Sequence, residues 1–210
     1  MLDSQITDGE VLASGEGIQA PQTLRIAIRP FRPEDSDAMF LAIRESVSEL
    51  CQWMVWCKRD YSPQDSVAFI SQCTREWIEK KSFSFVIVDS EDGTFLGSVG
   101  LNGIDPTHKF ANVGCWVRTD RTRKGICSTA IRLIAQFAFS QTDLKRLEFV
   151  VPVGNAASQR AVEKSGAVRE GLLRNRVLLN GASLDALMYS IVRDEFYRGA
   201  TATVPAGNSF

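Results

Sequence analysis

Histidine is almost absent from this sequence of 210 residues, in which His108 is the only one. A metal site made of several histidines is therefore excluded, and no Ser-His-Asp order of the hydrolase type is visible. A lone histidine in a loop that also contains proline is usually just exposed. We therefore expect no bound metal and no catalytic role for His108.

Paired cysteines are also lacking. The chain has five cysteines, an odd number, and none of them forms a Cys-x-x-Cys pair. This usage favours a reducing compartment and argues against a disulfide framework or a structural zinc site. The five are Cys51, Cys57, Cys73, Cys115 and Cys127.

Long apolar runs and an excess of charge of one sign are missing as well. No segment approaches the roughly 18 apolar residues that cross a membrane, and residues 1–22 have neither the basic start nor the apolar stretch of a signal peptide. The formal net charge of -1 gives no general attraction to nucleic acid or to an anionic membrane. These absences predict a cytoplasmic protein with no nucleic-acid or membrane partner.

The length suits one domain, and no internal repeat or second boundary is visible. The sequence predicts a flexible leader over residues 1–22, one domain over 23–196, and a flexible tail of small and polar residues over 197–210.

Hydrophobic periodicity predicts alternating strands and helices. Strands are expected near residues 24–28, 83–88, 95–101, 147–151, 167–179 and 183–192, and a central strand is expected after the loop 102–110, leading into the stretch that begins at Gly114. Helices are expected over about 33–50, from Pro63, from Ile126 and over 155–166. Asn180-Gly181 is a strong two-residue hairpin turn between the last two strands.

The most informative stretch is 114–130, GCWVRTDRTRKGICSTA, in which an apolar strand leads through a basic turn into an amphipathic helix. A helix N-terminus has unpaired N–H groups and a partial positive charge. Arg121, Arg123 and Lys124 add cations, and Gly125 lets the backbone approach a ligand closely. The stretch predicts a phosphate or pyrophosphate site; an ordinary turn with solvated basic residues is the alternative. No Gly-Lys-Ser/Thr or Gly-x-Gly-x-x-Gly motif supports nucleotide hydrolysis or dinucleotide binding.

Two blocks together resemble the GNAT superfamily of N-acetyltransferases. The first is residues 116–119 (WVRT) with 124–130 (KGICSTA), which looks like the acetyl-CoA motif. The second is residues 155–158 (NAAS), 163–167 (EKSGA), Asn180-Gly181 and Asp185, whose order resembles the RimJ and RimL branch that acetylates ribosomal-protein N-termini. The resemblance implies an α/β (mixed α+β) GNAT fold: a mixed, mostly antiparallel sheet of about seven strands, a V-shaped splay between two central strands, and about four flanking helices.

The resemblance also implies acetyl-CoA as cosubstrate, with pantetheine lying in the splay. Backbone pairing is expected from Trp116, Val117 and Arg118, and Asn155 is expected to bind pantetheine through its amide; a helix cap is the other interpretation of Asn155. The pyrophosphate would lie on the turn made of Arg123, Lys124, Gly125, Ile126, Cys127 and Ser128. The sequence departs from the family at Thr122, where Gln or Arg is usual, and at Cys127, where Gly or Ala is usual.

For catalysis, Ser158 is the candidate donor of a proton to the departing thiolate, with a solvated helix serine as the alternative. Asn112 stands where the family often has a glutamate, so Glu148 is the remaining candidate base. An ion pair of Glu148 with Arg146 or Lys145 is the other interpretation. A site without an evident base favours α-amines, because an N-terminal amine of pKa about 8 is already about 10% neutral at pH 7.

On the acceptor side, Trp53, Trp56 and Asn112 are the candidate substrate-binding residues; a cap over the core is the other interpretation of the two tryptophans. The expected acceptor is a protein or peptide N-terminus, bound by a monomer or homodimer. Two alternatives stay open: acetylation of a small amine such as a polyamine, amino acid or antibiotic, and a non-catalytic acyl-CoA-binding module with a drifted site.

Overall fold

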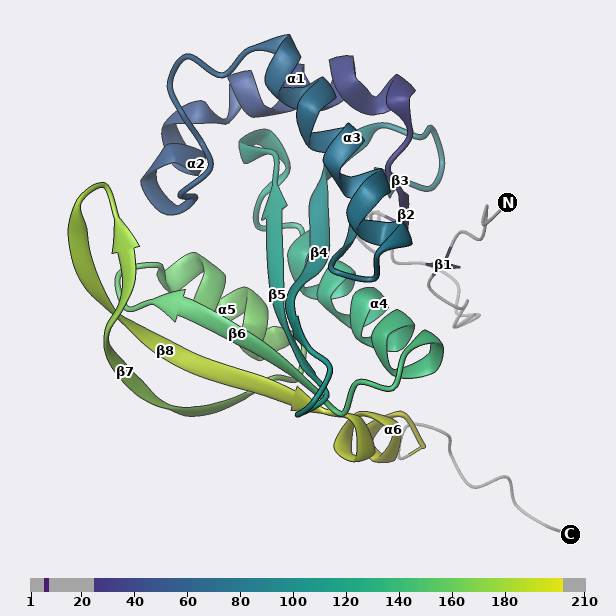
Figure 1. Ribbon diagram of the computed structural model, residues 1–210, viewed down its shortest axis with the longest axis vertical. Coiled ribbons are helices and arrows are strands. Elements are labelled where there is room, and N and C mark those ends of the chain that lie inside the picture. Colours follow the sequence, from purple (N-terminus) through teal and green to yellow (C-terminus); the bar gives the residue numbers. More distant parts are fainter. Residues whose placement is uncertain (1–5, 8–24, 202–210) are drawn as a thin grey trace, which may run out of the picture.

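The computed structural model describes residues 6–7 and 25–201, whose strands form one twisted sheet in the order β1-β2-β3-β4-β5-β6-β8-β7 (Figure 1). Neighbouring strands pair antiparallel, except β5 and β6, which are parallel. The strands are β1 Ile6–Thr7, β2 Ile26–Pro30, β3 Phe83–Asp89, β4 Phe95–Asp105, β5 Phe110–Val117, β6 Arg146–Pro152, β7 Val168–Leu179 and β8 Ala182–Val192. The mixed, mostly antiparallel sheet is confirmed, and the strand beyond the predicted seven is the two-residue β1.

Helices cover both faces of the sheet. Figure 1 shows α1, α2 and α3 gathered on one side, with α4 and α5 on the other. The helices are α1 Ser36–Glu45, α2 Val47–Trp53, α3 Pro63–Ile78, α4 Ile126–Gln141, α5 Ala156–Lys164 and α6 Arg193–Thr201. Apart from β1, the predicted leader lies outside the described residues, as does the chain beyond Thr201.

The central strands alternate apolar side chains and so build a core on each face. In β3, Phe83, Phe85 and Ile87 belong to the core that contains the buried side of α4. Val86 and Val88 point the other way, into the core shared with α1 and α3. The sheet is therefore held in place from both sides, and the ends of its central strands are fixed relative to the helices.

The single helix expected over residues 33–50 is two helices, α1 and α2, because the chain bends at Ser46. Ser46 leaves helical geometry, with φ -108° and ψ 8°, and its Oγ accepts a hydrogen bond of 3.0 Å from the backbone N–H of Thr119. Thr119 is the second residue after the end of β5. The bend therefore ties the start of α2 to the end of β5.

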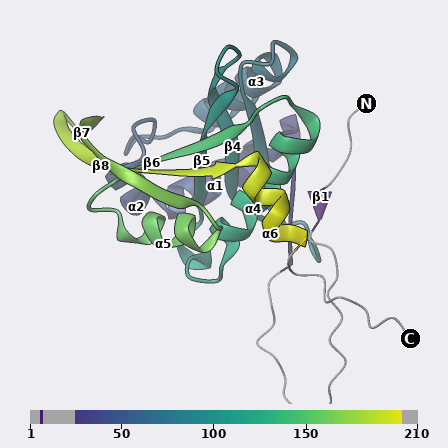
Figure 2. The same ribbon diagram turned by 90° about the horizontal axis from the view of Figure 1, so that it is seen from below.

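A sixth helix, α6, follows β8 and extends beyond the predicted domain end at residue 196. Its Phe196 packs on Phe139 of α4, with ring centroids 5.5 Å apart. Figure 2 shows α6 next to α4 when the molecule is seen from below. The folded part of the chain therefore includes residues that the sequence assigned to the tail.

Candidate functional site

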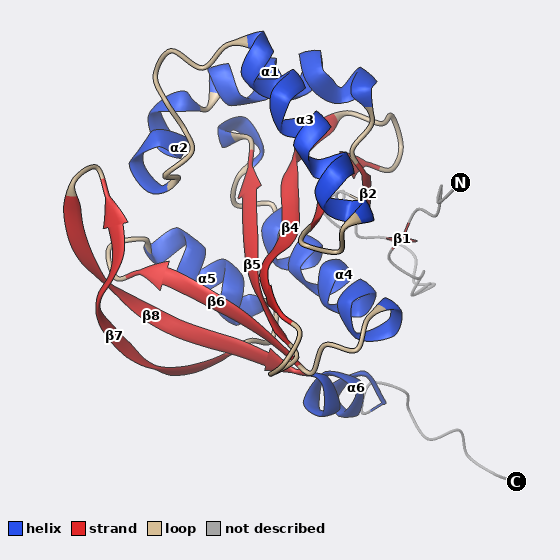
Figure 3. Ribbon diagram, viewed as in Figure 1, coloured by secondary structure: helices blue, strands red, loops and turns tan. Residues whose placement is uncertain are grey.

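The gap between β5 and β6 is the first feature of the site. The two strands pair only at Phe110, Ala111 and Asn112 of β5, opposite Arg146, Leu147 and Glu148 of β6. Beyond this point they separate, and Figure 3 shows them diverging from a common start. The later residues of β5, from Val113 to Val117, thus have no described strand partner on that side. An extended ligand can pair with such an edge as an added strand would.

The turn that follows β5 ends on an open helix N-terminus. Gly125 has φ 80° and ψ 0°, in the left-handed region that favours glycine, and it is the N-cap of α4. No side chain caps this end of the helix, since the N-cap residue is a glycine, and Ser128 donates its hydroxyl back to the Gly125 carbonyl at 2.9 Å. The first N–H groups of α4 are thus left for a ligand, as an anion site requires.

Of the cations near this turn, Arg123 and Lys124 suit a phosphate best. Both are exposed, and in the described part of the chain no carboxylate lies within ion-pair distance of either. Arg121 instead pairs with Asp120 at 3.4 Å, and Arg118 pairs with Glu45 at 2.7 Å. Arg123 is therefore the residue positioned to replace the cation lost at Thr122.

The backbone of Arg118, like its side chain, is engaged in contacts within the fold. Its N–H donates to the Leu96 carbonyl of β4 at 2.9 Å, so this N–H is not available for the expected pairing with pantetheine. Trp116 is 8% exposed and Val117 is half-buried, and both lie on the open stretch of β5. The backbone of residues 113–117 is therefore the part that can pair with a ligand.

The side chains of Ile126 and Cys127 pack the start of α4 against the rest of the fold. Ile126 is buried in the core around α4. The Cys127 Sγ lies 3.1 Å from the Cys115 Sγ of β5. This contact, together with burial, raises the pKa of Cys115 and keeps it a thiol. These side chains fix the start of α4 against β5. What the two residues can offer to a ligand is their backbone N–H groups.

Asn155 caps α5 at the far side of the gap. Its Oδ1 accepts a hydrogen bond of 3.0 Å from the Ser158 N–H, which is the capping role weighed above. The Nδ2 of Asn155 donates no side-chain hydrogen bond to any described residue. The cap and a ligand contact are therefore compatible, because they use different atoms of one side chain.

The two roles of Asn155 predict separable effects. Asn155→Asp keeps the capping oxygen and removes the amide donor, whereas Asn155→Ala removes both. We expect both variants to weaken acetyl-CoA binding about tenfold, for one lost hydrogen bond, and only the alanine variant to lose about 1 kcal/mol of stability. Calorimetric titration and thermal unfolding measure the two effects. Unchanged affinity of Asn155→Asp would remove Asn155 from the cofactor site.

The two candidate catalytic residues lie in different environments. Ser158 is half-buried, and its hydroxyl forms no hydrogen bond with any described residue, which leaves it available to a ligand. Glu148 is engaged: Arg146 donates to its Oε1 at 2.7 Å, and the same guanidinium binds Glu170. The ion-pair interpretation of Glu148 therefore holds in this structure.

Trp53 and Trp56 both reach the site region. The Trp53 ring lies against Gly154, next to Asn155, so closely that a Cβ built on Gly154 would be 3.3 Å from it. Trp56 is 45% exposed, and its ring centroid is 6.0 Å from that of Trp116. Each tryptophan thus lies against one side of the gap, Trp53 from the last residue of α2 and Trp56 from the segment that follows it.

Sequence reasoning missed a cavity of about 550 Å³ between α3 and the sheet. Its floor consists of small or polar residues on the face of β3, β4 and β5 that is turned to α3: Ser84, Ser98, Gly100, Asn102 and Gly114. Asn112 lies on the same face and donates to the Asn102 side chain at 3.0 Å. The available signal was the small residues at alternate strand positions, where a closed core would carry large apolar side chains.

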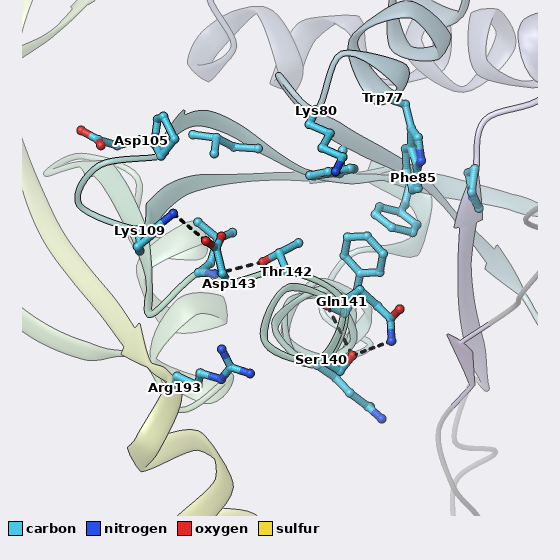
Figure 4. Close-up of a pocket in the computed structure, with 17 residues that line it drawn as sticks. Trp77, Lys80, Phe85, Asp105, Lys109, Ser140, Gln141, Thr142, Asp143 and Arg193 are labelled. Carbon is cyan, nitrogen blue, oxygen red and sulfur yellow. Dashed lines mark hydrogen bonds and ion pairs between the residues drawn. The ribbon is translucent and has the colours of Figure 1, made fainter.

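A larger cavity of about 1140 Å³ lies elsewhere, between the ends of α3 and α4. Its aromatic part includes Trp77 and Phe85, and Lys109 at its rim pairs with Asp143 at 2.5 Å (Figure 4). None of the candidate site residues lines it. Size alone therefore does not identify the site, and the cavity next to β5 is the one that adjoins the gap.

The described residues, 6–7 and 25–201, include neither a metal-binding cluster nor a membrane-spanning helix. They contain no group of three or more His, Cys, Asp or Glu side chains that could hold a metal ion. No helix among them is long and apolar enough to cross a membrane.

A gap between two parallel strands, followed by an uncapped helix N-terminus with free cations, is an arrangement suited to an extended ligand that ends in phosphates. The family model described as "Acetyltransferase (GNAT) domain" matches residues 25–168, and the chain belongs to this family. The protein is therefore an enzyme of the acyltransferase class, an acetyl-CoA-dependent N-acetyltransferase. The non-catalytic module considered above is set aside.

The chain is similar to named relatives over most of its length. "Putative ribosomal N-acetyltransferase YdaF" of Bacillus subtilis is 25% identical over 172 residues, covering 81% of this chain and 93% of the relative. The ribosomal-protein-serine acetyltransferase of Escherichia coli is 23% identical over 117 residues, covering 56% of this chain and 65% of the relative. The solved structure of the Microcin C7 self immunity acetyltransferase MccE, in complex with acetyl-CoA and AMP, is 27% identical with a TM-score of 0.75, covering 80% of this chain and 92% of its own.

Proposed function

We propose that this chain transfers the acetyl group of acetyl-CoA to the N-terminal α-amine of a protein or peptide. The observation that carries the proposal is the ion pair of Glu148, whose carboxylate is held by Arg146 at 2.7 Å. With this oxygen engaged by the guanidinium, Glu148 is placed as an ion-pair partner and not as the base of the reaction. The acceptor must then arrive partly neutral, which at pH 7 holds for about 10% of α-amines and below roughly 0.1% of lysine side chains. The relatives named for ribosomal acetylation support a protein acceptor.

In this proposal the chain holds both substrates together. The open edge of β5 and the Asn155 amide bind the pantetheine arm, and the turn at Gly125 with Arg123 and Lys124 binds the phosphates. A backbone N–H of residues 113–117 polarises the thioester carbonyl. The neutral amine attacks that carbon, the new C–N bond forms, and the C–S bond breaks. The amine loses a proton to water, the Ser158 hydroxyl donates one to the departing thiolate, and water returns the amine's proton to the Ser158 oxygen, so that the hydroxyl is restored. Proximity supplies much of the rate.

Ser158→Ala tests the proton donor. We expect kcat to fall about a hundredfold, the lower range for general acid catalysis, with little change in acetyl-CoA affinity. Ser71→Ala is the matched control, because Ser71 is exposed on α3 and bonds only the Val67 carbonyl at 2.9 Å. Equal kcat in Ser158→Ala and in the control would show that Ser158 takes no part in the chemical step.

A small amine is the second candidate acceptor, favoured by the partly enclosed cavity of about 550 Å³. To decide between the two, acetyl-CoA is supplied with a panel of peptides and a panel of small amines, and the products are analysed by mass spectrometry with fragmentation. The proposal predicts products one acetyl group heavier, acetylated at the α-nitrogen of peptides. Products from the small amines alone would replace it with the second candidate.

A further inference from the structure

The cavity beside β5 owes its volume to missing side chains. Along each of β3, β4 and β5, the residues that face α3 are large near α1, as at Val86, Phe95 and Trp116. Further along the same face they become small: Ser84, Gly100 and Gly114 form one row across the three strands. Three small residues in a row beneath α3 leave a space that is wide enough for a ligand a few heavy atoms across. The cavity extends from Trp56 and Trp116 at one end to Glu76 at the other.

Glu76 is an anion held in position within this cavity. Gln72 donates to its Oε1 at 2.6 Å, and the hydroxyl of the buried Ser82 donates to its Oε2 at 2.5 Å. These two hydrogen bonds lower the pKa of Glu76, so its carboxylate stays ionised at neutral pH and is a poor base. Each oxygen keeps a further acceptor position. No Lys or Arg nitrogen of the described residues lies within 4 Å of it.

The other charges that line the cavity neutralise each other. Lys58 and Asp65 form an ion pair of 3.0 Å at the end near Trp56. Hydrogen bonds from Ser62, and then from Lys58, hold the pKa of Asp65 at about 2. Glu76 is therefore the one charged residue of the cavity lining that has no ion-pair contact among the described residues, although Lys81 and Arg75 act on it from a longer distance. A partly buried anion is most stable beside a cation, and in this cavity the bound ligand has to supply that cation.

The distance across the sheet sets the position of that cation. Gly114 lies in β5 next to the gap, Gly100 is its partner in β4, and Ser84 is the partner of Gly100 in β3. Neighbouring strands are about 4.8 Å apart, so this row spans about 10 Å. Glu76 is held by Ser82, two residues before Ser84. Because Ser82 lies beyond the row, a guest whose reactive nitrogen lies at β5 meets Glu76 at a distance of about 10 Å or more.

We propose that the acceptor carries a second cationic group, an ammonium or guanidinium about 10 Å from the reacting amine, and that Glu76 binds it. The inference rests on the proposed function, because it places the reacting amine beside β5. The aliphatic stem of such a group lies over the small residues of the floor, with Trp56 and Trp116 flanking its reactive end. The same chemistry is offered by a peptide with Lys or Arg next to its N-terminus and by a diamine.

The test compares acceptors that differ only in the second charge. One pair is two peptides with Lys or Met at position two; the other is 1,7-diaminoheptane, whose two nitrogens are about 10 Å apart when extended, and heptylamine. With the wild-type protein we expect kcat/KM about tenfold higher for the charged member of a pair, as one charged hydrogen bond supplies. Preference in the peptide pair alone, or in the amine pair alone, identifies the source of the cation.

Glu76→Gln is expected to abolish this preference, so that kcat/KM becomes equal for the two members of each pair. Glu79→Gln is the matched control, because Glu79 also lies at the end of α3 but pairs with Lys81 at 2.6 Å. Glu76→Asp, which keeps the charge, should retain part of the preference. The wild-type comparison stands even if Glu76→Gln fails to fold.

A failure of this inference and a failure of the proposed function give different results. Acetylation of neutral acceptors as fast as of charged ones overturns the role of Glu76 and leaves the proposed function intact. A preference that persists in a folded Glu76→Gln also overturns that role. The absence of product from every acceptor overturns the proposed function and the inference with it.

Discussion

Replacing Gly125 with aspartate is expected to weaken acetyl-CoA binding at least about a hundredfold. Gly125 stands at the start of α4 with nothing closer than the Ser128 Oγ, 4.0 Å from the position of an added Cβ. A carboxylate there would face the ligand phosphates at about 5 Å, where each pair of like unit charges costs about 3 kcal/mol at an effective dielectric constant of 20. Calorimetric titration with acetyl-CoA measures the loss.

The control for this charge effect is Gly125→Asn. Asparagine has nearly the shape of aspartate, carries no charge, and tolerates the φ of 80° better than most residues do. We expect its affinity to stay within about tenfold of the wild type, as strain alone would leave it. If the two variants bind acetyl-CoA equally well, the phosphates do not lie at this turn.

Gly97→Ala is expected to destabilise the whole domain. Gly97 of β4 pairs with Val117 of β5, and an added Cβ would stand 2.1 Å from the Trp116 carbonyl oxygen. No side-chain movement relieves a clash with backbone, so β4 and β5 would have to separate next to the gap. We expect a loss of about 3 kcal/mol or more, which lowers Tm by about 6 to 12 °C.

Gly171→Ala provides the comparison for that variant. Gly171 lies in the edge strand β7, and an added Cβ there meets no atom within 4 Å. Its thermal unfolding should therefore match the wild type closely. A Gly97→Ala protein that unfolds at the same temperature as Gly171→Ala would show that β4 and β5 approach each other less closely than the structure has them.

Features with local causes could be predicted from the sequence. Helix α3 begins at Pro63, as expected, because Pro63 suits the first turn and Ser62 and Asp65 form a capping box. The turn at Gly125 was predicted because a glycine and its flanking cations are adjacent in the chain. In both cases a few neighbouring residues contain the whole reason for the structure.

Features with distant causes could not be predicted. The break between α1 and α2 depends on the bond from Thr119 to Ser46, across 73 residues. The cavity floor is assembled from three strands, and Glu76 gains its significance only when α3 covers that floor. The role of Glu148 was left between base and ion pair, and the contact with Arg146 is what the folded chain adds.

The central claim is that the gap between β5 and β6, together with the turn at Gly125, binds acetyl-CoA. Its most direct test is a calorimetric titration of the wild-type protein with acetyl-CoA, with free CoA as comparison. The account predicts saturable binding of both at one site per chain. The absence of any binding heat at millimolar acetyl-CoA, with a folded protein, would contradict it.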